Sequence, residues 1–129
     1  MPEPAAIPVP IISIIDDDES LCQGVASLIR SSGYAARSFA SAEAFLDWEG
    51  AEACACVITD IHMPGMSGIE LYRILAAREA PVPVIMITAR MEPGLTARLA
   101  SSGVVCLLPK PFEPAALLAC VEEALGRSP

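Results

Sequence analysis

Residues 57–68 read VITDIHMPGMSG, and the rest of the sequence is best understood from this stretch. Its first residues are apolar and largely β-branched, which is typical of a buried strand, and they end on the carboxylate of Asp60. A turn rich in glycine and proline follows. Ligands of open α/β sheets bind at the carboxyl ends of the strands, so an acid at this place is a candidate for chemistry. Taken alone, Asp60 is more simply explained as an acid that caps the following turn.

The length, composition and net charge of the chain exclude several classes of protein. A chain of 129 residues with 53% apolar residues forms one domain with a dense core. Its 16 acidic residues against 8 lysines and arginines give a net charge of -8, which argues against direct binding of nucleic acid or of an anionic membrane.

Domain boundaries follow from composition. Residues 1–10 contain four prolines and no basic residue, so they are expected to be a flexible lead-in and neither a signal peptide nor a membrane span. The domain is predicted to cover residues 11–126, and residues 127–129 are expected to be a tail or the start of a linker.

Cysteines and histidine give little support for a zinc site. The chain has an odd number of cysteines, no CxxC spacing and a single histidine, His62. We expect the cysteines to be small buried hydrophobes in a reducing cytosol, which predicts a cytoplasmic protein. They are Cys22, Cys54, Cys56, Cys106 and Cys120.

Apolar β-branched runs alternate with helical spacing along the whole chain. Five runs are predicted to be strands: residues 11–15, 35–39, 56–59, 84–88 and 104–108. Each is followed by a segment with helical periodicity. The predicted fold is therefore α/β, a doubly wound, flavodoxin-like parallel sheet with strand order 2-1-3-4-5 and five helices on its two faces.

Local signals mark several helix starts. Ser41 is a predicted N-cap, Ser67 and Glu70 have the spacing of a capping box, and Pro114 suits a first helical turn. The helix over residues 93–101 is the weakest prediction because Gly94 lowers its helix propensity.

Right-handed crossovers place the carboxyl ends of all the strands at one edge of such a sheet. Five polar residues then converge there: Asp16, Asp17, Asp60, Thr88 and Lys110. Converging carboxylates repel one another unless a cation neutralises them, and oxygen ligands suit Mg²⁺. A carboxylate beside Mg²⁺, an ammonium and a hydroxyl can accept a phosphoryl group. Each of these residues, taken alone, can be explained by an ordinary structural role, but such roles do not explain why the whole set falls at strand ends.

At this point the chain resembles the response-regulator receiver domain of two-component signalling, over residues 11–125. The matching text is IIDDDE at 14–19, TDIHMPGMSG at 59–68, TA at 88–89 and KPF at 110–112. The resemblance implies that Asp60 accepts a phosphoryl group from a histidine kinase or a phosphotransfer protein. It also implies that Asp16, Asp17, Asp60 and the backbone carbonyl of His62 hold Mg²⁺.

The same resemblance assigns the remaining pocket residues. Thr88 is expected to contact the phosphoryl group, Ala89 to leave it room, and Lys110 to pair with it through a cis bond to Pro111. Such a domain is a phosphoacceptor switch that promotes its own phosphorylation and slow dephosphorylation, and it is not counted as an enzyme.

Two positions depart from or vary within the family pattern. Leu107 stands where the family commonly has an aromatic switch residue, which puts the usual conformational signal in doubt. His62 stands where side chains tune loss of the phosphoryl group, and because a histidine titrates near neutral pH we expect it to modulate the lifetime of the aspartyl phosphate.

The run SAEAFL at 41–46 is similar to receivers fused to a helix-turn-helix output. The partner downstream is therefore expected to be a fused output domain or a separate protein, and a homodimer through the fourth and fifth helices is possible by analogy. Two other functions stay open: a receiver-like module that acts without phosphorylation because of Leu107, and a small aspartyl-phosphate hydrolase.

Overall fold

The computed structural model describes residues 9–100 and 102–126, so most of the expected lead-in and the expected tail at 127–129 lie outside the described residues. One five-stranded parallel sheet has the order β2-β1-β3-β4-β5, as predicted. The strands are β1 (Ile11–Ile15), β2 (Ala35–Phe39), β3 (Cys56–Asp60), β4 (Val84–Thr88) and β5 (Cys106–Pro109). The helices are α1 (Glu19–Ser31), α2 (Ala42–Asp47), the 3-10 helix η1 (Glu49–Glu52), α3 (Gly68–Ala76), α4 (Leu95–Ala100) and α5 (Pro114–Ala124).

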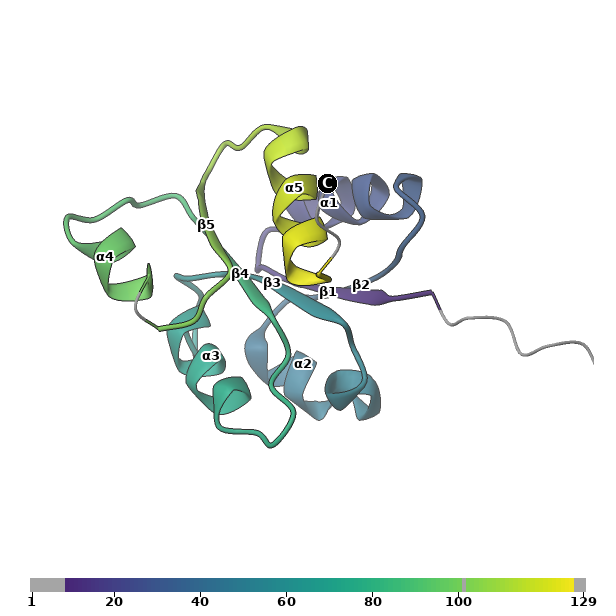
Figure 1. Cartoon of the computed structure of the whole chain (residues 1–129), viewed down its shortest axis with the longest axis horizontal. Helices are drawn as coiled ribbons and strands as arrows, with labels where there is room; N and C mark the ends of the chain where they lie inside the picture. Colours follow the sequence, from purple (N-terminus) through teal and green to yellow (C-terminus); the bar gives the residue numbers. More distant parts are fainter. Residues whose placement is uncertain (1–8, 101, 127–129) are drawn as a thin grey trace, which may run out of the picture.

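Helices cover both faces of the sheet. Helices α1 and α5 lie on one face, and α2, α3 and α4 lie on the other (Figure 1). Over the described ranges, no helix has both the length and the apolar content that a membrane crossing requires.

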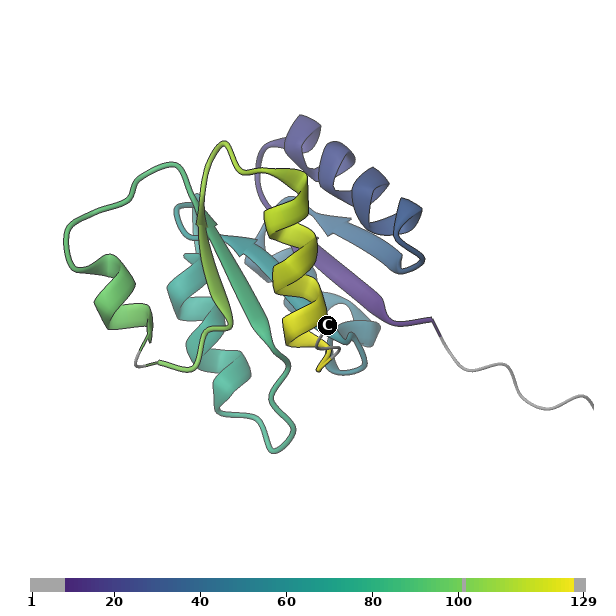
Figure 2. The same ribbon diagram turned by 45° about the horizontal axis from the view of Figure 1, so that its top comes forward.

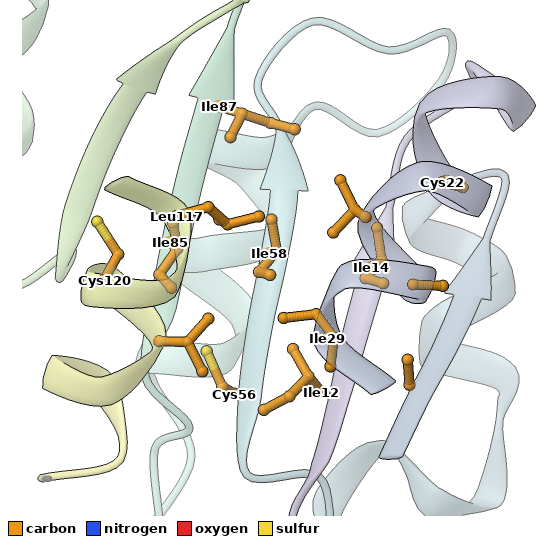
Figure 3. Packing of buried hydrophobic residues seen from close by; sticks show 14 residues of the cluster. Ile12, Ile14, Cys22, Ile29, Cys56, Ile58, Ile85, Ile87, Leu117 and Cys120 are labelled. Atoms are coloured by element: carbon orange, nitrogen blue, oxygen red, sulfur yellow. The ribbon is translucent and has the colours of Figure 1, made fainter. Parts of the chain in front are cut away.

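The two faces arise from the alternation of side chains along each strand. Ile12, Ile14, Ile58 and Ile85 point to the face covered by α1 and α5, where they pack in one fully buried cluster (Figure 3). Strand residues at alternate positions, among them Ile15, Val57, Val84 and Met86, belong to the opposite cluster, under α2, α3 and α4. The central strands β3 and β4 are buried throughout, which explains their near-continuous apolar sequence.

The predicted element boundaries are mostly correct, with differences of a few residues. Strand β5 begins at Cys106, and the predicted start at Val104 is wrong because pairing with β4 starts only at Ile85 and Cys106. The helix predicted over residues 93–101 is shorter, and η1 has no counterpart in the predictions.

The expectation for the cysteines holds for three of the five. Cys22, Cys54 and Cys56 are free and buried. Cys106 and Cys120, however, form a disulfide between β5 and α5, so the expectation of reduced, separate thiols is wrong for this pair. The two residues are 14 apart in the sequence but adjacent in space, and sequence alone does not determine which cysteines pair.

The loop after Asp60 is held by the predicted capping box. The Ser67 hydroxyl accepts a hydrogen bond from the Glu70 amide (3.1 Å), and the Glu70 carboxylate accepts one from the Ser67 amide (3.2 Å). The next residue, Gly68, donates its amide hydrogen to the Ile61 carbonyl. A Cβ atom at Gly68 would overlap the backbone carbonyl oxygen of Asp60, so this close approach requires glycine.

We therefore predict that Gly68→Ala lowers the free energy of unfolding by about 2 kcal/mol, because the added methyl group displaces the backbone that follows β3. Urea denaturation measures the change. Gly24→Ala is the matched control: Gly24 is an exposed position within α1 with no atom within 4 Å of the added Cβ, so alanine there should stabilise by roughly 0.5–1 kcal/mol. A Gly68→Ala protein as stable as the wild type would contradict this packing.

Candidate functional site

The candidate site lies at the carboxyl ends of the strands, as the sheet topology predicts. Asp60 ends β3, Thr88 ends β4, Asp16 follows β1, and Lys110 follows β5. Figure 2 shows the loops after β1, β4 and β5 rising to the same edge of the sheet. The functional candidates therefore come from four strands that are far apart in sequence and adjacent at one edge.

Three carboxylates and one ammonium meet at this edge. Oxygens of Asp16, Asp17 and Asp60 lie within 4.8 Å of one another. The Lys110 ammonium lies 2.8 Å from Asp16 Oδ2 and 3.4 Å from Asp60 Oδ2. Asp16 and Asp60 are buried (1% and 6% exposed), whereas Asp17 is exposed. The cluster is thus open to solvent on the Asp17 side and closed beneath.

The electrostatics of the cluster disfavour charge on Asp60. Burial raises the pKa of the Asp60 carboxyl, the neighbouring Asp16 carboxylate raises it further, and Lys110 offsets only part of this. For Lys110, burial alone would lower the pKa, but the hydrogen bond and charge of Asp16 together with Asp60 outweigh it, and the pKa of the ammonium is raised. Lys110 is therefore a permanent cation in a site with more negative than positive charge.

Thr88 ends β4, the strand that pairs with β3, but its hydroxyl has other partners. The hydroxyl donates to the Arg90 carbonyl (3.1 Å) and accepts a hydrogen bond from the Arg90 amide (3.0 Å). The side chain thus fastens the start of the β4–α4 loop. Ala89 follows and is exposed, so the backbone next to Thr88 is not covered by a large side chain.

His62 lies on the loop after β3, and its side chain is exposed. Its Nε2 atom is 3.8 Å from Glu92 Oε1 on the β4–α4 loop, and the two side chains are 44% and 53% exposed. The two loops therefore approach each other on the solvent side of the site. On the opposite loop, the peptide bond between Lys110 and Pro111 is cis, as the resemblance implied.

Leu107 is half-buried and packs against the apolar cluster on the α2, α3 and α4 face. Its neighbour Leu108 packs against the opposite cluster, as alternation along β5 requires. A leucine in this position contributes no polar group to the edge of the sheet.

One positioning residue was missed by the sequence analysis. The Glu43 carboxylate, on α2, accepts a hydrogen bond from the Met66 amide (3.1 Å) in the loop after Asp60. That contact spans 23 residues, and no local pattern indicates it. Gly65, at the same loop, has φ of +78° and lies against the same carboxylate, so the turn suits glycine.

The residues at the edge fit a hard divalent cation. Their donor atoms are all carboxylate oxygens, without sulfur or imidazole, which is the donor set of Mg²⁺. Asp17 is exposed, so an ion can reach the cluster from solvent. Asp16, Asp17 and Asp60 are the side chains that would hold the ion.

The chain is similar over nearly its whole length to proteins of one family. The profile described as "Response regulator receiver domain" matches residues 12–122. The transcriptional regulatory protein FixJ of Azorhizobium caulinodans is 40% identical over 125 residues, which are 97% of this chain and 58% of FixJ. The response regulator protein TmoT of Ectopseudomonas mendocina is 35% identical over 92% of this chain and 54% of TmoT. The chain thus spans about half the length of these curated relatives.

Solved structures agree in fold. A response regulator receiver protein from Burkholderia phymatum superposes with a TM-score of 0.79 and 37% identity, covering 92% of this chain and 97% of that one. The structure named FixJ-N gives a TM-score of 0.80 and 30% identity, covering 95% and 98%. The family profile covers most of this chain, and a relative is 40% identical over nearly all of it. This chain therefore belongs to the response regulator receiver domain family of two-component signalling.

Proposed function

We propose that Asp60 is the phosphoacceptor of this receiver domain and that its phosphorylation changes which protein the domain binds. The single observation that carries the proposal is the buried Asp60 carboxylate with the Lys110 ammonium 3.4 Å away. A carboxylate in this setting can act as a nucleophile, and a fixed cation beside it can meet the charge on the transferred oxygens.

The phosphoryl donor in this proposal is the phosphohistidine of a sensor histidine kinase or of a phosphotransfer protein. An Asp60 oxygen attacks phosphorus, the bond between phosphorus and nitrogen breaks, and the imidazole leaves with a proton from water. When Mg²⁺ is bound by Asp16, Asp17, Asp60 and the carbonyl of His62, it supplies positive charge to the carboxylates and the phosphoryl oxygens. Lys110 supplies the remaining charge from the β5 side.

The conformational response would begin at Thr88. Its hydroxyl now donates to the Arg90 carbonyl, so donating to a phosphoryl oxygen instead would release the start of the β4–α4 loop. Ala89 leaves the new group room, and Pro111 holds the chain beside Lys110. Leu107 can follow the loop by repacking, although it has no ring to rotate between an exposed and a buried position.

The partner downstream is, in this proposal, a separate protein or an output domain in the same polypeptide. FixJ of Azorhizobium caulinodans carries the name transcriptional regulatory protein and is longer than the matched segment, which supports the second arrangement. The domain would act in the cytoplasm, where a kinase can reach Asp60, and two copies could associate. Neither the family profile nor the relatives support the alternative module that acts without phosphorylation.

We predict that incubation with acetyl phosphate and Mg²⁺ adds one phosphoryl group to the chain and that Asp60→Asn abolishes this gain completely, because the amide nitrogen of asparagine is not a nucleophile. Intact mass spectrometry measures the gain. Asp47→Asn, which changes an exposed acid at the end of α2, is the matched control and should be phosphorylated like the wild type.

A wild-type chain without any gain, or an Asp60→Asn chain with the same gain, would contradict the assignment of Asp60. Continuous release of phosphate over many turnovers, without accumulation of the modified protein, would instead identify a hydrolase.

We further predict that His62→Ala shortens the lifetime of the aspartyl phosphate several-fold, because removing the imidazole opens the solvent side of the site to water. Decay of the phosphorylated mass with time, at one fixed pH, measures the lifetime. Glu92→Gln keeps the size of the side chain facing His62 and is the control expected to decay like the wild type. Equal lifetimes for His62→Ala and wild type would show that His62 does not affect loss of the phosphoryl group.

A further inference from the structure

A pair of cysteines connects the edge strand of the sheet to the last helix. Cys106 is the first residue of β5, and Cys120 is on α5. Their Cα atoms are 6.0 Å apart and their sulfurs are joined. Figure 3 shows Cys120 directed from α5 toward the β5 side of the sheet. We propose that Cys106 and Cys120 form a reversible thiol–disulfide couple that locks α5 onto β5 in the oxidised protein and releases it in the reduced protein.

Exposure makes this pair the site where an oxidant would react. Cys106 is partly exposed, whereas the three free cysteines are buried. Burial also raises the pKa of the Cys56 thiol to about 12, so it does not form a thiolate at neutral pH. Cys106 is therefore the entry point for a thiol reagent, and the buried Cys120 is the resolving partner.

The chemistry balances with a low-molecular-weight disulfide such as oxidised glutathione as the oxidant. The Cys106 sulfur attacks one sulfur of the oxidant, a mixed disulfide forms, and one small thiol leaves. The Cys120 sulfur then attacks Cys106, and the second small thiol leaves. The protein loses two thiol hydrogens, which end on the two small thiols.

A disulfide with one accessible sulfur can be opened again by the reverse reaction with a small thiol. In a reducing compartment such disulfides are transient and respond to the supply of oxidant, unlike the permanent ones of secreted proteins. The partial exposure of Cys106 thus favours a couple that cycles over one that stays closed.

The cross-link encloses a functional segment. The residues between the two cysteines include Leu107, Lys110 and Pro111, together with the start of α5. A closed loop limits how far β5 and α5 can move apart, and so it limits how far Lys110 can follow a change at Asp60. This last effect rests on the proposed function, whereas the couple itself does not.

The first test counts thiols in the full chain. After exposure to reduced or oxidised glutathione, the protein is unfolded and alkylated with iodoacetamide, and its intact mass is measured. The reduced chain should take up one group on each of its 5 cysteines, and the oxidised chain should leave only the three free cysteines reactive. Peptide mapping should place the loss at Cys106 and Cys120. Five reactive thiols after oxidation, or a loss at other cysteines, would overturn the proposal.

The second test measures how much the disulfide between β5 and α5 stabilises the protein. Closing a loop of this length should raise the melting temperature of the oxidised chain by roughly 10 °C over the reduced chain. Cys106→Ser should remove the difference, and Cys54→Ala, which changes a free buried cysteine, should keep it. Equal melting temperatures for oxidised and reduced wild type would refute the lock.

The same two samples can be compared for phosphorylation by acetyl phosphate. Slower phosphorylation of the oxidised chain is expected, because Lys110 is restrained, and equal rates would refute the coupling to the site. If neither sample is phosphorylated, the proposed function fails, while the thiol count and the melting temperatures still decide whether the couple exists.

Discussion

The ion pair between Lys110 and the two buried carboxylates is the interaction on which the candidate site depends. Lys110 contacts Asp16 at 2.8 Å and Asp60 at 3.4 Å, and it follows β5, which β3 and β4 separate from β1. Without a cation between them, two carboxylates would not remain buried side by side. The Lys110 contact therefore joins the ends of β1, β3 and β5 across the top of the sheet.

The rest of the fold holds this unfavourable arrangement in place. Two apolar clusters, one under α1 and α5 and one under α2, α3 and α4, fix the strands from both faces. Three contacts then fix the loop after Asp60: capping by Ser67, close packing at Gly68 and the hydrogen bond from the Met66 amide to Glu43. The stability of the packed layers offsets the repulsion at the edge, which leaves the carboxylates ready for a cation or a phosphoryl group.

Patterns that act over a few residues could be predicted from the sequence. The apolar runs of β3 and β4 and the capping box at Ser67 depend on neighbours in the chain, and the predicted elements agree with the structure there. The convergence of Asp16, Asp60 and Lys110 followed from parallel topology. Contacts set by tertiary packing could not be predicted: the Glu43 anchor and the bond between Cys106 and Cys120 have no local signal, and the Thr88 hydroxyl could face either the site or its own loop.

The most direct test of the central claim is thermal unfolding of wild type and Asp60→Asn with and without Mg²⁺. Without Mg²⁺, Asp60→Asn should be more stable by on the order of 1 kcal/mol, because one of three converging negative charges is removed. Mg²⁺ should stabilise the wild type strongly and the variant weakly. A wild type that is more stable than Asp60→Asn without Mg²⁺, or that does not respond to Mg²⁺, would contradict the account of this site.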